Sequence, residues 1–194
     1  MGGPVCIRTR VVPRRSGRAL GVPMNADVER AFAALEAHGT GFEGALEKYS
    51  AALWRDVDRL LPGYGPSWYR EMTQRFSVGG ANFHYPVDPD RDYMGECTIH
   101  RPAWLPEFIE RVNVYFRELF QQGFFCFADG GDGDLWLFRN DAVDDPPVFF
   151  FELSSYGGGP ASADNGMIAP SLTLSQLLRH GAAWKAEEDQ HADT

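Results

Sequence analysis

Cysteine is scarce in this chain of 194 residues. The three thiols, Cys6, Cys97 and Cys126, lie far apart, and no CxxC pair occurs. An odd number of distant cysteines fits neither a disulfide framework nor a structural zinc site. The cysteine pattern therefore favours a reducing compartment and predicts a cytoplasmic protein.

Long apolar runs are also missing. A membrane-spanning helix needs roughly 18–20 consecutive apolar residues, and no run of that length occurs. The arginine-rich start lacks the apolar core of a secretion signal, and Cys6 stands where a myristoylation motif requires serine or threonine. An organelle transit peptide is an alternative, but hydroxyl residues, which such peptides contain in number, are few in this segment. We therefore expect no membrane partner.

The motifs of common catalytic and cofactor sites are absent as well. No GxGxxG, GxSxG or HExxH occurs, and no lysine of a phosphate loop follows the glycines at 157–159. His38 and His180 each precede a glycine at a predicted helix end, and His84 and His100 lie near strands without a ligand partner. Because a triad can assemble from distant residues, an enzyme stays the least favoured alternative. We expect no catalytic residue, metal or cofactor.

Negative charge is in excess but unevenly distributed. The whole chain has a formal net charge of −9, whereas residues 1–23 contain five arginines and no acid. Residues 24–194 hold 13 basic and 27 acidic residues, a formal net charge of −14. Such a body repels phosphate backbones and attracts basic proteins, so the charge argues against nucleic acid and for a protein partner. The alternative is that the acidity only aids solubility.

The length and composition predict one domain with a sizeable core. Domains commonly contain about 100–200 residues, and 44% of this chain is apolar. We expect a disordered basic tail over 1–23, a single domain over 24–184 and a frayed polar tail over 185–194. Met24 as an alternative start would remove the first of these segments. The oligomeric state is not predicted.

Apolar spacing and capping residues predict the helices. Asn25 caps a helix over 26–38, and Thr40 with Glu43 opens a second helix that ends at Pro62. The apolar stripe of that second helix is Phe42, Leu46, Tyr49, Leu53, Val57 and Leu60. The remaining predicted helices are a short one from Pro66 to Phe76, a long one over 104–122 and one over 173–184 with Thr173 and Gln176 as a capping box.

Short alternating or apolar runs predict strands in the second half of the chain. The expected strands cover 81–86, 96–100, 124–127, 134–139, 147–153 and 167–169, with a glycine-rich loop over 154–166. Helices mixed with a succession of hairpins indicate an α+β fold.

Two acidic segments are candidate sites. Asp129-Gly130-Gly131-Asp132-Gly133-Asp134 could bind calcium, but its acids fall at positions 1, 4 and 6 rather than 1, 3 and 5. We interpret it as a tight turn, with glycines at positive φ and aspartates accepting from freed N–H groups. The second segment contains Asp141, Asp144 and Asp145, which we predict to be a partner-binding surface, with an ordinary solvated loop as the alternative.

The order of three groups of residues resembles the SUKH superfamily, which contains fungal Smi/Knr cell-wall regulators and many bacterial immunity proteins. These groups are Leu60-Leu61-Pro62 with Trp68, Tyr69, Met72 and Gly79-Gly80; the glycine-aspartate turn with Leu135-Trp136-Leu137; and Val148 to Glu152 with Ile168, Leu174, Leu177 and Leu178. The resemblance covers residues 45–182. An additional N-terminal helix, a loop over 85–92 and the long aromatic-rich helix depart from the family pattern.

The resemblance implies an α+β domain with a mainly antiparallel sheet, helices packed around it and no shared catalytic site. The glycine-aspartate motif of the family corresponds to Gly131, Gly133 and Asp134 in this chain. We expect these three residues to have a structural role. Bacterial members neutralise a cognate polymorphic toxin, which predicts an immunity protein whose acidic surface covers a basic toxin domain. The alternative is a regulatory or scaffolding module unrelated to toxins.

Overall fold

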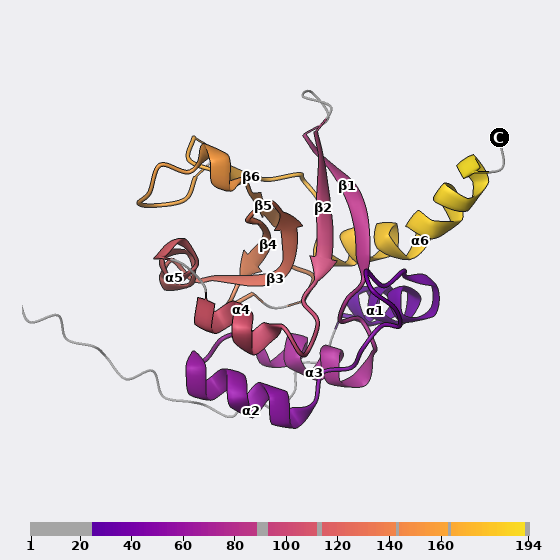
Figure 1. The fold of residues 1–194 in the computed structure, drawn as a ribbon, viewed down its shortest axis with the longest axis horizontal. Coiled ribbons are helices and arrows are strands. Elements are labelled where there is room, and N and C mark those ends of the chain that lie inside the picture. The colour runs from indigo at the N-terminus through magenta and orange to yellow at the C-terminus, as the bar shows by residue number, and fades with distance from the viewer. Residues whose placement is uncertain (1–24, 89–92, 112–113, 143, 163, 193–194) are drawn as a thin grey trace, which may run out of the picture.

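The protein is an α+β domain built on one antiparallel sheet (Figure 1). The computed structural model describes residues 25–88, 93–111, 114–142, 144–162 and 164–192. The predicted tail over 1–23 lies outside the described residues. Within them the sheet has six strands in the order β1-β2-β3-β4-β5-β6, and every neighbouring pair is antiparallel. The predicted fold class is therefore confirmed.

The strands follow one another as a meander, so each pairs with its neighbour in the sequence. Their bounds are β1 Asn82–Asp88, β2 Tyr93–Ile99, β3 Phe124–Gly131, β4 Asp134–Arg139, β5 Phe149–Phe151 and β6 Met167–Ile168. The helices are α1 Ala26–His38, α2 Ala51–Leu60, α3 Ser67–Arg75, α4 Leu105–Arg111, α5 Val114–Gln121 and α6 Leu174–Ala192, with a 3₁₀ turn η2 over Leu153–Ser155. In Figure 1, α2, α3 and α4 gather below the sheet, and α1 and α6 lie on the side of β1.

Local signals place α1 and α3 as predicted. Asn25 caps α1, because its Oδ1 accepts a hydrogen bond from the N–H of Asp27 at 2.8 Å. Pro66 precedes the first residue of α3, where its fixed φ suits the entry to a helix. Both signals lie within a few residues of the helix that they start, so the sequence alone carries them.

The predicted helix start at Thr40 is wrong. The backbone there pairs with another segment: the N–H of Phe42 donates to Gly80 O and that of Glu47 to Gly79 O, both at 2.9 Å. The helix begins only at Ala51, after Ser50, whose Oγ accepts from the N–H of Leu53 at 3.0 Å. Long-range pairing therefore replaces the first turns of the predicted helix.

Two other helices also differ from the prediction. In place of one helix over 104–122, the structure has α4 and α5, which point in different directions in Figure 1. The last helix continues to Ala192, so residues 185–192 are helical rather than a frayed tail, and His180 lies inside a helix rather than at its end. Gly181 permits close packing there, because a Cβ at this position would overlap the ring of Phe83.

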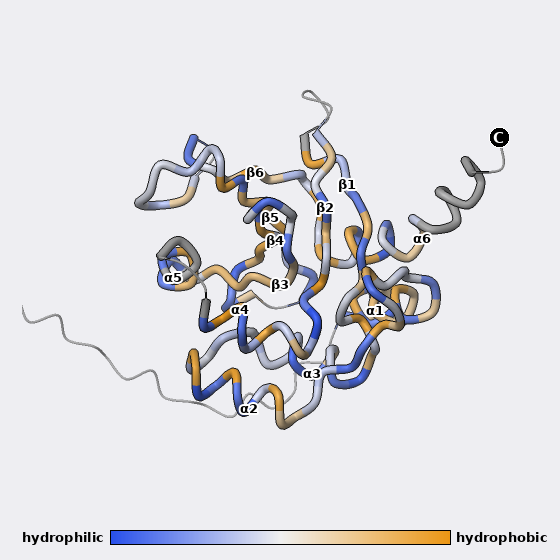
Figure 2. Tube along the Cα trace, viewed as in Figure 1, coloured by the Kyte–Doolittle hydropathy of each residue, from blue (hydrophilic) through white to orange (hydrophobic). Residues whose placement is uncertain are grey.

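The core is rich in aromatic side chains. Tyr69 of α3 packs edge-on against Phe125 and Phe138 of the sheet, with ring centroids 5.0 and 5.7 Å apart. Phe32 of α1 reaches the same tyrosine at 6.0 Å. Hydrophobic stretches lie on the strands around β4 and β5 and in α1 (Figure 2). Burial of these rings is the main source of stability.

The outer edge of β1 is protected against pairing with other chains. The N–H of Asn82 donates to Thr40 O at 2.8 Å, and the Nε2 of His180 donates to the carbonyl of His84 at 2.7 Å. Pro86 has no N–H to offer. An unprotected edge strand is a template for aggregation. Here α6 and the segment before α2 cover the outer edge of β1.

Candidate partner-binding surfaces

The acidic loop over 140–145 is fixed at its start. The Oδ1 of Asn140 accepts from the N–H of Gly65, and its Nδ2 donates to the carbonyl of Gly63, both at 3.0 Å. The indole of Trp68 donates to the carbonyl of Ala142 at 2.8 Å. These three bonds tie the loop to the connection between α2 and α3 and to the first turn of α3.

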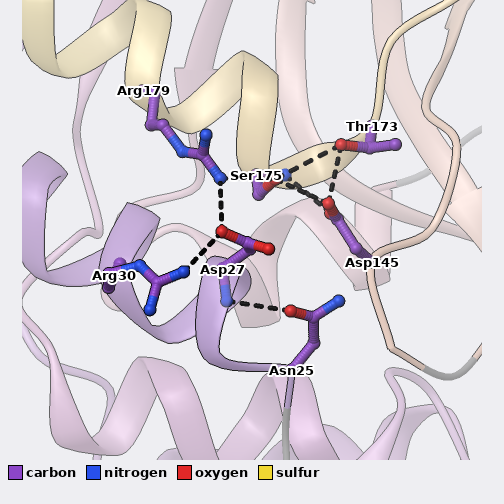
Figure 3. A network of polar contacts seen from close by, with 7 residues as sticks. All are labelled: Asn25, Asp27, Arg30, Asp145, Thr173, Ser175 and Arg179. Carbon is purple, nitrogen blue, oxygen red and sulfur yellow. Dashed lines mark hydrogen bonds and ion pairs between the residues drawn. The ribbon is translucent and has the colours of Figure 1, made fainter.

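The far end of the loop is fixed by Asp145, which caps α6 (Figure 3). Its Oδ1 accepts from the N–H of Ser175 at 2.8 Å, and its Oδ2 accepts from the hydroxyls of Ser175 and Thr173 at 2.6 and 2.8 Å. A carboxylate is favoured here because the first N–H groups of a helix are unpaired and the N-terminal end of its dipole is positive. The carboxylate oxygens of Asp145 are therefore engaged within the protein.

The predicted capping box at this helix is only half formed. The Oε1 of Gln176 accepts from the N–H of Thr173 at 2.8 Å, as the motif requires. The hydroxyl of Thr173, however, donates to Asp145, which supplies the capping acceptor from outside the helix. The N-terminus of α6 thus depends on a residue almost thirty positions away.

The same region joins α6 to α1. Arg179 lies 3.3 Å from Asp27 Oδ1 and 3.3 Å from the Oγ of Ser175 (Figure 3). Arg30 bonds the same oxygen of Asp27 at 2.7 Å. Because these side chains are about half exposed, each ion pair is worth only a fraction of a kcal/mol. They join the start of α1 to the second turn of α6.

We expect Asp145→Ala to lower the free energy of unfolding by about 2 kcal/mol, because it removes the cap and two hydroxyl partners. Chemical denaturation of the intact chain measures this loss. Asp144→Asn is the matched control, since Asp144 is exposed and asparagine tolerates its φ of 62°. Equal stability of the Asp145 variant and the wild type would show that the cap contributes nothing.

Asp141 and Asp144 are the two acids that the loop presents to solvent. Both are exposed, and the nearest cation to Asp141 that we observe is the exposed Arg139, at 3.8 Å. The loop is tied to the body on both sides of them, and Asp144 has left-handed backbone geometry. Position 143 lies outside the described residues. The structure therefore separates two exposed carboxylates, Asp141 and Asp144, from the capping carboxylate Asp145.

The glycine-aspartate segment forms a hairpin turn between β3 and β4. Gly131 and Gly133 have φ of 79° and 89°, which suits glycine. Asp134 accepts from the N–H of Leu153 at 2.8 Å and from the hydroxyl of Tyr93 at 2.9 Å. Burial raises the pKa of Asp134 above its ordinary value. These three motif residues shape the turn and join it to η2 and β2.

Asp129 also serves this turn. Its Oδ1 accepts from the N–H of Gly131 at 2.8 Å, and burial raises its pKa. In the part of the chain that the structure describes, no group of three or more His, Cys, Asp or Glu side chains is placed to hold a metal ion. The segment thus has the turn geometry that the sequence predicts.

One cysteine and one histidine meet in the core. The Sγ of Cys126 lies 3.5 Å from the Nε2 of His100. Burial raises the pKa of this thiol and lowers the pKa of His100 to about 3, so both groups are neutral near pH 7. A reactive cysteine needs thiolate character and access to solvent. This pair has neither, and its role is packing.

One exposed aromatic pair was not predicted from the sequence. Phe42 and Trp104 are 54% and 38% exposed, and their ring centroids lie 6.4 Å apart. The predicted helix placed Phe42 on a buried stripe. Gly41 and Gly44, which lie within the predicted helix, were a signal against it, because glycine is a poor helix former.

No family model, curated protein or solved structure matches this chain. The resemblance to the SUKH superfamily therefore stays a prediction. Among the described residues, none of the helices has the length and apolar character that a membrane span requires.

Proposed function

We propose that this chain is a non-catalytic protein-binding domain of the SUKH type, an immunity protein that neutralises a basic toxin domain. The observation that carries this proposal is the pair of exposed carboxylates Asp141 and Asp144 on a loop tied to the body at both ends. A fixed loop presents its charges without a large ordering cost on binding. The resemblance to a family with many immunity proteins supplies the toxin as the partner.

The charge of the body supports the same function. Residues 24–194 carry a formal net charge of −14, and such a field raises the rate at which a basic partner arrives. An acidic domain placed over the active site of a basic toxin competes with the toxin's anionic substrate. Binding alone then suffices for neutralisation, and no reaction is required of this chain.

Co-expression tests the proposal. The intact chain is produced together with the toxin-like product of a neighbouring gene, and growth is measured. Restored growth supports an immunity protein. Cell death with every neighbouring candidate contradicts the toxin assignment, and a non-toxin partner that binds through Asp141 and Asp144 would then establish a regulatory module.

Neutralising Asp141 and Asp144 together as asparagines is expected to slow association with a basic partner roughly three- to tenfold at low salt. Dissociation should change less, because steering acts before contact. Stopped-flow measurements at increasing salt test this, and the difference should shrink as salt screens the charges.

The control for this variant removes two other exposed carboxylates, through Glu71→Gln and Asp164→Asn. It changes the net charge of the chain by the same amount. Equal slowing by the two double variants would assign the effect to total charge and contradict a role for the acidic loop.

A further inference from the structure

Phe42 and Trp104, both exposed and in contact, form an apolar surface that we call the aromatic patch. The two rings come from segments far apart in the sequence: Phe42 precedes α2, and Trp104 immediately precedes α4. They meet edge to face, with an interplanar angle of 76°. Single exposed apolar residues are common, but two large rings in contact make a continuous apolar surface.

The backbone holds both aromatic residues in place. The N–H of Phe42 donates to Gly80 O at 2.9 Å, and Gly41 forms a bridge with Ala81 of the sheet region. The N–H of Trp104 donates to Arg101 O at 3.0 Å. The patch therefore requires little ordering when it is covered.

Arg101 packs over the ring of Trp104. Its guanidinium lies 5.2 Å from the centre of the Trp104 ring. Its Nε donates to Glu47 at 2.7 Å, and its Nη1 donates to Glu43 at 3.0 Å. Rigid aromatic residues beside an arginine are the composition that dominates binding energy in protein interfaces.

The charges around the patch identify the chemistry of what covers it. One arginine faces two glutamates, and Glu43 remains 56% exposed at its side chain. The local sum of these three side chains is negative, so a basic surface is attracted and an anionic membrane or nucleic acid is repelled.

We propose that the aromatic patch is the anchoring site for a basic protein segment, one that places an aliphatic side chain against Phe42 and Trp104 and its lysine or arginine side chains toward Glu43 and Glu47. This inference rests on the proposed function, because the partner is the basic protein that the acidic loop attracts. The acidic loop accelerates encounter, whereas the aromatic patch slows dissociation.

A peptide probe tests the patch without any natural partner. The intact chain is labelled with 5-fluorotryptophan, and the ¹⁹F signal of Trp104 is assigned with Trp104→Phe. A short peptide amide of alternating lysine and leucine is added. The Trp104 signal should shift to saturation, while the signals of the buried Trp54 and Trp136 stay in place.

Two altered peptides separate charge from apolar contact. Replacing lysine by glutamate, or leucine by serine, should weaken binding, as followed by the Trp104 signal, at least roughly tenfold. High salt should weaken binding of the parent peptide. An unmoved Trp104 signal, or an equal shift with all three peptides, would overturn the proposal.

Variants with matched exposure complete the test in the co-expression assay. Phe42→Ala and Trp104→Ala should increase the dissociation rate from the toxin at least roughly tenfold and reduce rescue. Leu60→Ala and Met94→Ala remove apolar residues that are 39% and 42% exposed, and they should rescue normally. Melting curves of all four variants exclude loss of fold as the cause.

The two proposals fail separately. Rescue by the wild type and equally by Trp104→Ala would overturn the patch and leave the immunity function standing. Specific peptide binding at Trp104 without rescue by the wild type would overturn the toxin assignment and support the patch as a site for basic segments.

Discussion

Arg70→Ala is expected to lower the free energy of unfolding by about 3 kcal/mol and the melting temperature by roughly 10 °C, because it removes charged hydrogen bonds to partly buried groups. The guanidinium of Arg70 binds both oxygens of Asp58 at 2.7 and 2.8 Å and the carbonyl of Gly65 at 3.1 Å. It also donates to the carbonyl of Tyr64 and lies 4.9 Å from the ring of Trp54. One side chain thereby joins α2, α3 and the connection between them.

The magnitude depends on how far water screens this cluster. The side chain of Arg70 is 18% exposed, whereas that of Asp58 is 44% exposed, so the ion pair contributes less than a buried pair would. The carbonyls of Tyr64 and Gly65 lose a donor in any case. Asp58 has a lowered pKa, caused first by its hydrogen bonds from Arg70, and the variant should return it toward its ordinary range.

Arg59→Ala is the matched control. Arg59 pairs with Asp56 within the same helix, and both side chains are mostly exposed, at 76% and 54%. Such a pair is worth at most about 0.5 kcal/mol. Denaturation curves that coincide for the two arginine variants would show that the Arg70 cluster has no special structural role.

Acidification is the second change with a large expected effect. Burial lowers the pKa of His100 from 6.5 to about 3. Between these values the unfolded chain binds a proton at this histidine that the folded chain excludes, so stability falls as the pH is lowered. The loss approaches about 1.4 kcal/mol per pH unit, or about 2.5 kcal/mol two units below 6.5.

Other groups titrate in the same range, so a variant must isolate the histidine. The lowered pKa of Asp58 and of Glu36 also costs stability in acid, whereas the raised pKa of Asp129 and of Asp134 acts in the opposite direction. The informative quantity is therefore the stability difference between His100→Phe and the wild type, measured by denaturation at each pH.

As the pH falls below 6.5, the free energy of unfolding of His100→Phe should rise relative to that of the wild type by about 1.4 kcal/mol per pH unit. Phenylalanine keeps a ring beside Phe108, which lies 4.2 Å from the imidazole centre. The exposed His38 gives a control, and His38→Gln should follow the wild type. A difference that stays constant with pH would exclude His100 as the titrating group.

Local patterns in the sequence determined much of the fold. The N-cap at Asn25, the entry of α3 after Pro66 and the positive φ of Gly131 and Gly133 each depend on residues close in the chain. The succession of short apolar runs likewise predicted the hairpins of an antiparallel α+β fold. These features were predictable because the groups that satisfy one another are neighbours in sequence.

Contacts between distant segments decided the remaining features. Pairing of Phe42 and Glu47 with the Gly79-Gly80 backbone removed the predicted helix start, and it thereby exposed the ring of Phe42. The residues with the helical apolar spacing lie instead in an irregular segment, which hydrogen-bonds to the chain before β1 and to the start of β1. The spacing of apolar residues along the sequence does not reveal hydrogen bonds to a distant backbone segment.

Contacts between distant segments also decided which acids of the 140–145 loop are exposed. In the sequence, Asp141, Asp144 and Asp145 are three equivalent acids of one polar loop, but only the folded chain brings Asp145 against the N-terminus of α6. The unpaired N–H groups of that helix take this carboxylate and leave Asp141 and Asp144 to solvent. The sequence by itself determined that the loop is acidic, and the tertiary structure decided which of its charges are exposed to solvent.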